Sequence, residues 1–285
     1  YIERCENQTR LLRAAIARIE EALDQNDPAR AVFTARIMAR LGLHIPRAAL
    51  EAPETLPGAL AAHHLGGGED GLAQQVERLL RAALNLRDRL SVDTWRALQR
   101  LRDDVRRLHQ TNLRGDTQTR LHDLILTVES LSGLSMENMT RGPLWLFMDS
   151  GRRVERAITI VDTLAGALTD ADSEDAVPMD LLLELWDSAM TYRSRYLSSP
   201  RLAAVLDLLL CDESNPRSLG FQLAALEDHM DNLARIAGEN GFLRPEQRLM
   251  TVLCGTVRTT DAVVLARFDR DAGYMDAERL LENFR

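Results

Sequence analysis

Four polar side chains near the start of the sequence share one face of an expected helix. They are Glu3, Glu6, Asn7 and Arg10. Separations of three, four and seven residues place side chains on the same side of an α-helix. Such a stripe can line a cleft with carboxylates, or it can be a solvated face, because Glu–Arg pairs four residues apart are common on helices. Both interpretations stay open.

The densest group of polar residues surrounds a Gly-Pro turn at 142–143. Pro143 suits the first turn of a helix, whose exposed N–H groups and positive end favour a carboxylate or phosphate. Asn138, Thr140 and Arg141 precede that turn. Helix caps use the same residue types, so Asn138 and Thr140 are also expected as caps.

The helix expected after this turn carries one carboxylate followed by several arginines. Asp149 is followed by Arg152, Arg153 and Arg156 at spacings of three, four and seven, with Glu155 between them. These side chains can pair along the helix or with another helix. A buried network of this kind costs desolvation and is tolerated where it defines a site or a register.

Two further groups lie in the C-terminal half. On an expected apolar helix, Asp187 shares one face with Thr191 and Ser194, whose small hydroxyls permit close helix packing. Alternatively, Asp187 can hold a substrate or order a neighbouring arginine such as Arg193. The loop 212–218 contains Asn215 and Arg217, and its acidic entry favours the dipole of the next helix.

Familiar metal and nucleotide motifs are missing from the sequence. There is no Glu-x-x-His, HExxH, P-loop, GxGxxG or GxSxG. His229 follows Glu227 and Asp228, but adjacent positions point to different helix faces, which argues against a local metal site. Binding of Mg²⁺ by carboxylates alone stays open, and no other cofactor is indicated.

Composition excludes several classes of protein. Carboxylates outnumber basic side chains by 43 to 35 and the formal net charge is −8, whereas nucleic-acid modules need a basic surface. No segment approaches the roughly 20 apolar residues of a membrane helix. The three cysteines have no CxxC spacing, which fits a reducing compartment. We therefore expect a cytoplasmic protein without nucleic-acid or membrane partners.

Apolar residues recur at helical spacing along the chain, and alternating strand-like segments are missing, which predicts an all-α fold, a large multi-helix bundle. Helices are expected at 1–23, 29–41, 72–86, after Ser91, and from Leu121 to near Gly133. Pro143, Pro178, Pro216 and Pro245 each open an apolar-periodic run. The segment 45–71 has three prolines and a run of three glycines, which predicts a long surface connection.

We expect a single helical domain over 1–285. Two similar halves, 1–133 and 134–285, are the alternative, because Tyr1–Cys5 resembles Arg153–Ala157 and each segment opens a long helix. Coincidence between two Arg/Glu-rich helices explains this similarity equally well.

Six ordered blocks of sequence resemble the Alpha-E family. The blocks are YIERCEN at 1–7, DTWR at 93–96, ENMTRG at 137–142, GRRVER at 151–156, DSAMTYR at 187–193 and DESNPRS at 212–218. Six blocks in order are far more specific than any one of them. The resemblance implies a helical domain encoded beside, or fused to, circularly permuted ATP-grasp ligases and transglutaminase-like peptidases, in what look like bacterial peptide-forming or peptide-tagging systems. The motif-matched residues would then line a cleft: Glu3, Glu6, Arg141, Arg152, Glu155, Asp187, Arg193 and Asn215.

Two hypotheses follow from the resemblance. In the first, the chain is a catalytic or substrate-holding partner of an ATP-grasp amidoligase. Arg141, Arg152 and Arg193 would grip a carboxylate or acyl phosphate, and Glu3 or Glu155 would act as base. This hypothesis requires the Arg and Glu blocks to converge. In the second, the chain is a non-catalytic scaffold that docks the ligase, and the same residues form a buried ion-pair network. No nucleophile or activated base identifies it as an enzyme.

Overall fold

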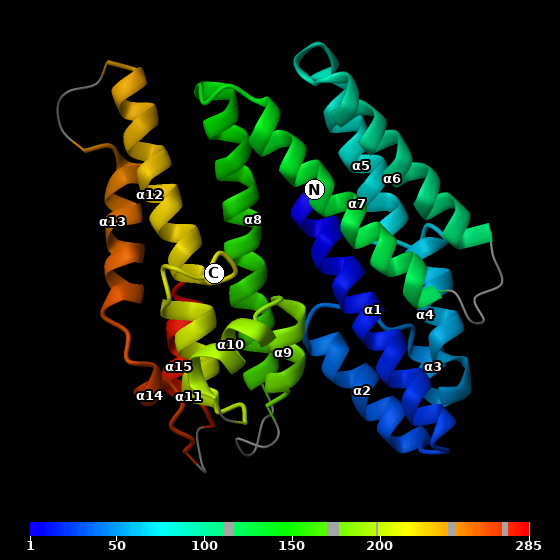
Figure 1. Cartoon of the computed structure of the whole chain (residues 1–285). Coiled ribbons are helices and arrows are strands. Elements are labelled where there is room, and N and C mark those ends of the chain that lie inside the picture. Colours follow the sequence, from blue (N-terminus) through cyan, green and yellow to red (C-terminus); the bar gives the residue numbers. More distant parts are fainter. Residues whose placement is uncertain (111–116, 170–176, 198, 239–242, 270–272, 285) are drawn as a thin grey trace. The chain divides into compact units, whose positions relative to one another are not determined.

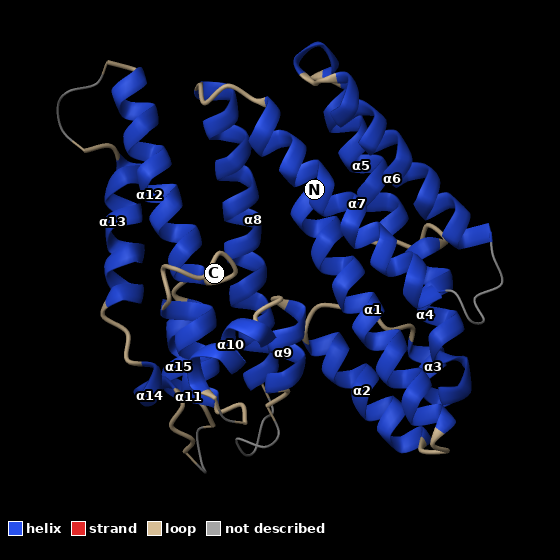
Figure 2. Ribbon diagram, in the orientation of Figure 1, coloured by secondary structure: helices blue, strands red, loops and turns tan. Residues whose placement is uncertain are grey.

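The computed structural model describes residues 1–110, 117–169, 177–197, 199–238, 243–269 and 273–284. Helices form nearly all of the regular structure in these residues, so the all-α prediction is confirmed (Figures 1 and 2). The chain divides into two compact units, Tyr1–Met139 and Thr140–Arg285. Whether the two units act as one domain stays a prediction.

The first unit is built around its N-terminal helix. Its elements are α1 (Ile2–Asp24), α2 (Pro28–Arg40), α3 (Arg47–Glu51), η1 (Pro53–Thr55), α4 (Leu56–Leu65), α5 (Leu72–Leu84), η2 (Arg87–Arg89), α6 (Val92–Gln110) and α7 (Thr117–Asn138). Helix α1 packs against α2, α4, α5 and α7 (Figure 1). Leu12, Ile16 and Ile19 are at most 1% exposed, and burying each side chain stabilises the fold by about 1.5–3 kcal/mol.

The segment 45–71 is not the surface connection that its composition suggests. It contains α3, η1 and α4, and Leu56, Leu60 and Leu65 of α4 are buried. Pro57 lies in the first turn of α4, where a missing N–H costs nothing because that N–H has no intrahelical acceptor. The prolines of this segment therefore start helices instead of preventing them.

Helix α7 continues past Gly133, where the sequence predicted its end. A single glycine inside a helix costs about 1 kcal/mol relative to alanine, which tertiary packing overrides. Here Leu131 and Ser135 are both buried, and the Ser135 hydroxyl donates to the carbonyl of Leu131. Asn138 consequently lies in the last turn of α7 and not in a joint between helices.

The second unit contains the longest helix of the described chain. Its elements are α8 (Pro143–Leu168), α9 (Met179–Leu185), α10 (Ala189–Tyr196), α11 (Leu202–Leu206), the π-helical turn η4 (Asp207–Cys211), α12 (Leu219–Ile236), α13 (Pro245–Arg258), α14 (Ala262–Leu265) and α15 (Met275–Glu282). Helix α8 packs against α12 and α15, α12 packs against α13, and α11 packs against α14 (Figure 1).

The prolines predict most of the helix starts in this unit. Pro143 and Pro245 occupy the first positions of α8 and α13, and Pro178 immediately precedes α9. Helix α12 does not start at Pro216, because Ser218 caps it by accepting a hydrogen bond from the N–H of Phe221 at 3.0 Å. The C-terminal half of α8 is buried among apolar neighbours, which leaves its first four turns to carry polar residues.

Candidate functional site

Asp149 is the centre of a buried polar cluster on α8. Its side chain is 1% exposed. Because Arg152 and Arg153 follow three and four residues later, both guanidiniums lie on the same helix face as the carboxylate. Oδ1 of Asp149 lies 3.5 Å from Nη1 of Arg152, and Oδ2 lies 2.7 Å from Nε of Arg153. The expected pairing along this helix is confirmed.

Helix α12 supplies a third partner for the same carboxylate. Nε2 of His229 lies 2.8 Å from Oδ2 of Asp149. Burial alone raises the pKa of a carboxyl group, but the hydrogen bonds from His229 and Arg153 and the charges of Arg153 and Arg152 outweigh it and lower the pKa of Asp149 to about 2. Asp149 is therefore ionised near neutral pH.

An exposed arginine lies beside this cluster, held by an indole ring. The ring of Trp145 meets the ring of His229 edge-on, with 5.2 Å between centroids. Cζ of Arg141 lies 4.2 Å from the centroid of the Trp145 ring, at cation–π distance. In the described part of the chain, no carboxylate lies within ion-pair distance of Arg141. We call Arg141, Trp145, Asp149, Arg152, Arg153 and His229 the α8 cluster.

The start of α8 has no side-chain cap. Gly142 is the N-cap residue, so the capping roles expected for Asn138 and Thr140 are wrong for this helix. The indole N–H of Trp145 and the hydroxyl of Ser150 are buried without a hydrogen-bond partner among the described residues. Unsatisfied buried donors are rare in native proteins and need an explanation.

Arg153 also connects α8 to the start of α12. Its Nη1 donates to Oε1 of Gln222 at 3.4 Å, and its Cζ lies 5.3 Å from the ring centroid of Phe221. Nε2 of Gln222 donates to the carbonyl of Pro216 at 2.8 Å, and Arg156 donates to the same carbonyl at 3.4 Å. The loop before α12 is thus tied to α8 by side chains.

Asn215 holds that loop in shape. Its Nδ2 donates to the carbonyl of Leu208 at 3.0 Å and to the hydroxyl of Ser188 at 3.3 Å. Its Oδ1 accepts from the backbone N–H of Arg217 at 3.1 Å, and the residue is 5% exposed. These contacts give Asn215 a structural role, and the binding role expected for it and for Arg217 stays a prediction.

Other predicted residues of the second unit lie outside the α8 cluster. Asp187 is exposed between α9 and α10, with a left-handed backbone (φ 48°), and Arg193 is exposed on α10. Glu155 is half-buried on α8, one turn after Arg152. Arg141 and Arg152 both belong to the α8 cluster, in which Trp145, His229 and Asp149 connect them. Asp187 and Arg193 lie outside it. Their binding roles, and that of Glu155 as a base, stay predictions.

The predicted stripe on α1 is buried, so its interpretation as a solvated face is wrong. Glu3, Glu6 and Arg10 are between 3% and 6% exposed, and Asn7 is half-buried. Nε of Arg10 lies 3.1 Å from Oε1 of Glu6, and its Nη2 lies 2.5 Å from Oε1 of Glu129 on α7. We call Glu6, Arg10 and Glu129 the α1 cluster. The expected meeting of Glu3 with residues of the second unit stays a prediction.

Three histidines lie together in the first unit, and of these His64 is buried, His63 half-buried and His44 exposed. The rings of His44 and His63 stack at 4.1 Å, and His63 meets His64 edge-on at 4.9 Å. His64 is 1% exposed and lies within hydrogen-bond distance of Gln8 and of the carbonyl of His44. Burial, helped by the neighbouring rings, lowers the pKa of His64 to about 4, against the hydrogen bond to His44.

Sequence reasoning missed the partners that other helices supply. His229, Trp145, Gln222 and Glu129 were not predicted as members of a site. A weak signal existed for His229, because a histidine on the apolar face of a helix needs a polar partner when it is buried. Nothing in the sequence names that partner, since Asp149 is 80 residues away.

The described residues were also searched for metal sites and for membrane-spanning helices. Among them, no group of three or more His, Cys, Asp or Glu side chains is arranged to hold a metal ion. None of the described helices is long and apolar enough to cross a membrane.

The fold and these clusters define an all-α protein with buried arginine–carboxylate networks. The model of the Alpha-E family, described as a predicted alpha-helical domain with a conserved ER motif, matches residues 1–284, so the chain belongs to this family. Over 187 residues, 62% of this chain, it is 33% identical to uncharacterised proteins of Mycobacterium tuberculosis and Mycobacterium bovis. The match spans 20% of the length of those proteins. No solved structure matches the chain.

Proposed function

We propose that this chain handles substrate for a cytoplasmic ATP-grasp amidoligase system, and that the α8 cluster holds a carboxylate or phosphate group of that substrate. The main support for the proposal is the position of the Arg141 side chain. Its guanidinium is exposed and is positioned by the face of Trp145 instead of by a carboxylate. A cation oriented in this way keeps its N–H donors available for an anionic ligand.

The local charge supports an anion. The stretch 141–156 contains four arginines and two carboxylates. Asp149 is occupied by Arg152, Arg153 and His229. The first turn of α8 adds the positive end of the helix dipole, and Gly142 provides no capping oxygen that competes with a ligand.

The proposal assigns binding to the α8 cluster and not proton transfer. Asp149 is a poor general base, because its pKa of about 2 lies far below neutral pH and its oxygens already accept from Arg153 and His229. Its role is to fix the two neighbouring guanidiniums. The ligase would then carry out the chemistry at the carboxylate or phosphate. That partner is the one implied by the resemblance to ATP-grasp-associated proteins.

A docking scaffold is the second candidate function, and the α1 cluster favours it. Glu6 and Arg10 are buried and bonded to each other, and Arg10 also binds Glu129 on α7. Such a network holds two helices in register without any ligand. A scaffold of this kind would bind the ligase through its surface and would not depend on Arg141.

The test combines this chain with the ATP-grasp ligase encoded in the same genome and measures ATP turnover with and without the chain. We expect the chain to raise turnover and Arg141→Ala to reduce this stimulation at least about ten-fold, since a lost charge-assisted contact costs roughly 1.5–3 kcal/mol. Arg235→Ala is the matched control, because Arg235 is an exposed arginine of α12 that hydrogen-bonds Asn232.

Two results would contradict the proposal. If the chain binds the ligase and Arg141→Ala stimulates turnover as well as the unmodified protein does, the scaffold function is supported instead. If the chain neither binds nor stimulates the ligase, the assignment to an ATP-grasp system is wrong.

A further inference from the structure

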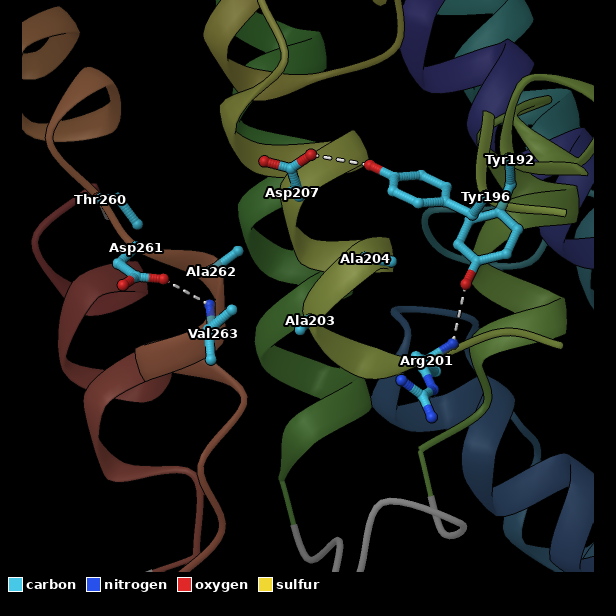
Figure 3. A pocket seen from close by; sticks show the side chains of 10 residues that line it. All are labelled: Tyr192, Tyr196, Arg201, Ala203, Ala204, Asp207, Thr260, Asp261, Ala262 and Val263. Carbon is cyan, nitrogen blue, oxygen red and sulfur yellow. Dashed lines mark hydrogen bonds between the residues drawn. The ribbon is translucent and has the colours of Figure 1, made fainter. Parts of the chain in front are cut away.

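A cavity of about 620 Å³ opens in the second unit, over one face of α11 (Figure 3). Ala203 and Ala204 form its floor. The tyrosines Tyr192 and Tyr196 of α10 form one wall, and residues 260–263, at the start of α14, form the wall on the other side of α11. The size is that of a site for a small molecule. No residue of the α8 cluster lines it.

The tyrosine wall is fixed by hydrogen bonds. The hydroxyl of Tyr192 accepts from the backbone N–H of Arg201 at 3.0 Å and donates to the carbonyl of Ser199 at 3.2 Å. The hydroxyl of Tyr196 donates to Oδ2 of Asp207 at 2.8 Å, and the two rings lie 4.8 Å apart. The wall is therefore formed in advance of any ligand.

Opposite charges flank the floor of the cavity. Arg201 precedes α11 and Asp207 follows it, so six residues of helical rise separate them by about 9 Å along the axis. In the described part of the chain, neither side chain has an ion-pair partner. Oδ2 of Asp207 accepts from Tyr196, and Figure 3 shows its other oxygen directed away from that tyrosine.

Unusual backbone geometry occurs in, or next to, two of the elements that line the cavity. Asp207 begins a π-helical turn, in which the N–H of Asp212 bonds the carbonyl of Asp207 at 3.0 Å. Helix α10 lies between two non-glycine residues in the left-handed region, Asp187 and Leu197, both with φ of 48°. π-Turns and left-handed residues of this kind are costly and cluster at functional sites.

We propose that this cavity binds a small zwitterion, with its carboxylate on Arg201, its ammonium group on Asp207 and an apolar middle over Ala203 and Ala204. An anion alone would leave the Asp207 carboxylate unmatched, and a cation alone would leave Arg201 unmatched. Asp261 adds negative charge at the cavity wall, although its Oδ1 already accepts from the N–H of Val263 at 2.8 Å. The alanines leave room for a methylene chain that spans the two charges.

The first test is isothermal titration calorimetry of the full chain with three probes of the same carbon length: ε-aminocaproate, hexylamine and caproate. We expect ε-aminocaproate to bind at least about ten-fold more tightly than either singly charged probe, because only it satisfies both ends of the cavity. Absence of binding by ε-aminocaproate overturns the proposal. Equal binding of hexylamine or caproate overturns it as well, since the site would then recognise one charge.

The second test locates the binding. Asp207→Asn and Arg201→Gln should each weaken ε-aminocaproate binding about ten-fold, whereas the exposed controls Asp228→Asn and Arg235→Gln on α12 should not change it. Ala204→Phe fills the floor and should abolish binding even if a charge variant misfolds. Circular dichroism verifies the fold of each variant. Unchanged binding by Ala204→Phe would place the ligand elsewhere and overturn the proposal. Binding in this cavity does not involve Arg141. The zwitterion proposal can therefore fail while the proposed anion site is confirmed, and the reverse.

Discussion

Both the α1 cluster and the α8 cluster contain an acid and an arginine of the same helix. The α1 cluster is centred on an arginine, whereas the α8 cluster is centred on a carboxylate. On α1, one guanidinium, that of Arg10, contacts the carboxylates of Glu6 and Glu129. On α8, one carboxylate, that of Asp149, contacts three nitrogen groups. In both helices the acid precedes its arginine by four residues. The pair within one helix therefore buries one acid and one arginine. The residue that the neighbouring helix contributes decides whether acidic or basic groups are in the majority.

This difference separates a structural role from a binding role. The third member of the α1 cluster is a carboxylate from α7, so the arginine is enclosed by acids. The third partner of Asp149 in the α8 cluster is the imidazole of His229 from α12, and the ring of Trp145 lies between that imidazole and Arg141. The second arrangement is the one suited to an anionic ligand.

Removing the carboxylate at the centre of the α8 cluster should have the largest effect on stability. Asp149→Ala leaves the guanidiniums of Arg152 and Arg153 without their shared counter-charge in a site that is largely buried. We expect a loss of about 3–5 kcal/mol in the free energy of unfolding, measured by urea denaturation. Asp180→Ala, at an exposed aspartate of α9, is the control. A loss equal to that of the control would mean that the α8 cluster contributes nothing to folding.

Acid should weaken the two units in different pH ranges. The folded pKa of His64 is lowered from 6.5 to about 4, so the stability from its neutral form is complete above pH 6.5 and is lost as pH falls toward 4. This loss is on the order of 3 kcal/mol. The pKa of Asp149 is lowered from 3.8 to about 2, so its contribution is lost only below pH 3.8.

Hydrogen exchange measured by mass spectrometry distinguishes these ranges, after correction for the intrinsic pH dependence of exchange. We expect peptides of α4 to lose protection between pH 6.5 and 4, and peptides of α8 to keep theirs. Simultaneous loss in both helices would show that His64 does not control the acid response of the first unit.

The link between α1 and α7 should be weaker than the centre of the α8 cluster. Glu129 is 37% exposed at its side chain, so water screens its contact with Arg10. A double-mutant cycle with Arg10→Met and Glu129→Gln should give a coupling energy of about 1 kcal/mol. A coupling several times larger would mean that both clusters are equally rigid, and the contrast between them would disappear.

The sequence predicted those contacts of each cluster that lie within a single helix. Residue spacing was enough to place Glu6 and Arg10 together, and Asp149 with Arg152 and Arg153, because three- and four-residue separations have one geometric meaning in a helix. Periodicity also predicted α1 and α8, and Pro143 predicted where α8 begins. Contacts between charged residues of the same helix can therefore be predicted from the sequence.

Contacts between helices could not be predicted in this way. Glu129 and His229 lie 119 and 80 residues from their partners, and no spacing rule operates over such separations. Tertiary packing also overrode two local signals: the prolines of the segment 45–71 start helices, and Gly133 does not end α7. Residue spacing did not predict the cavity over α11, because its walls come from separate helices, α10 and α14, and its floor is two alanines.

NMR of the Trp145 indole tests most directly whether the α8 cluster binds an anion through Arg141. Phosphate and acetate would be titrated separately into the full chain and into Arg141→Ala, with Arg235→Ala as control. Arg141 is exposed, so its loss should cost less than about 1 kcal/mol of stability. We expect a saturable shift of the Trp145 resonance with at least one anion, and we expect Arg141→Ala to weaken the binding about ten-fold. No shift with either anion, or the same shift in Arg141→Ala, would contradict it.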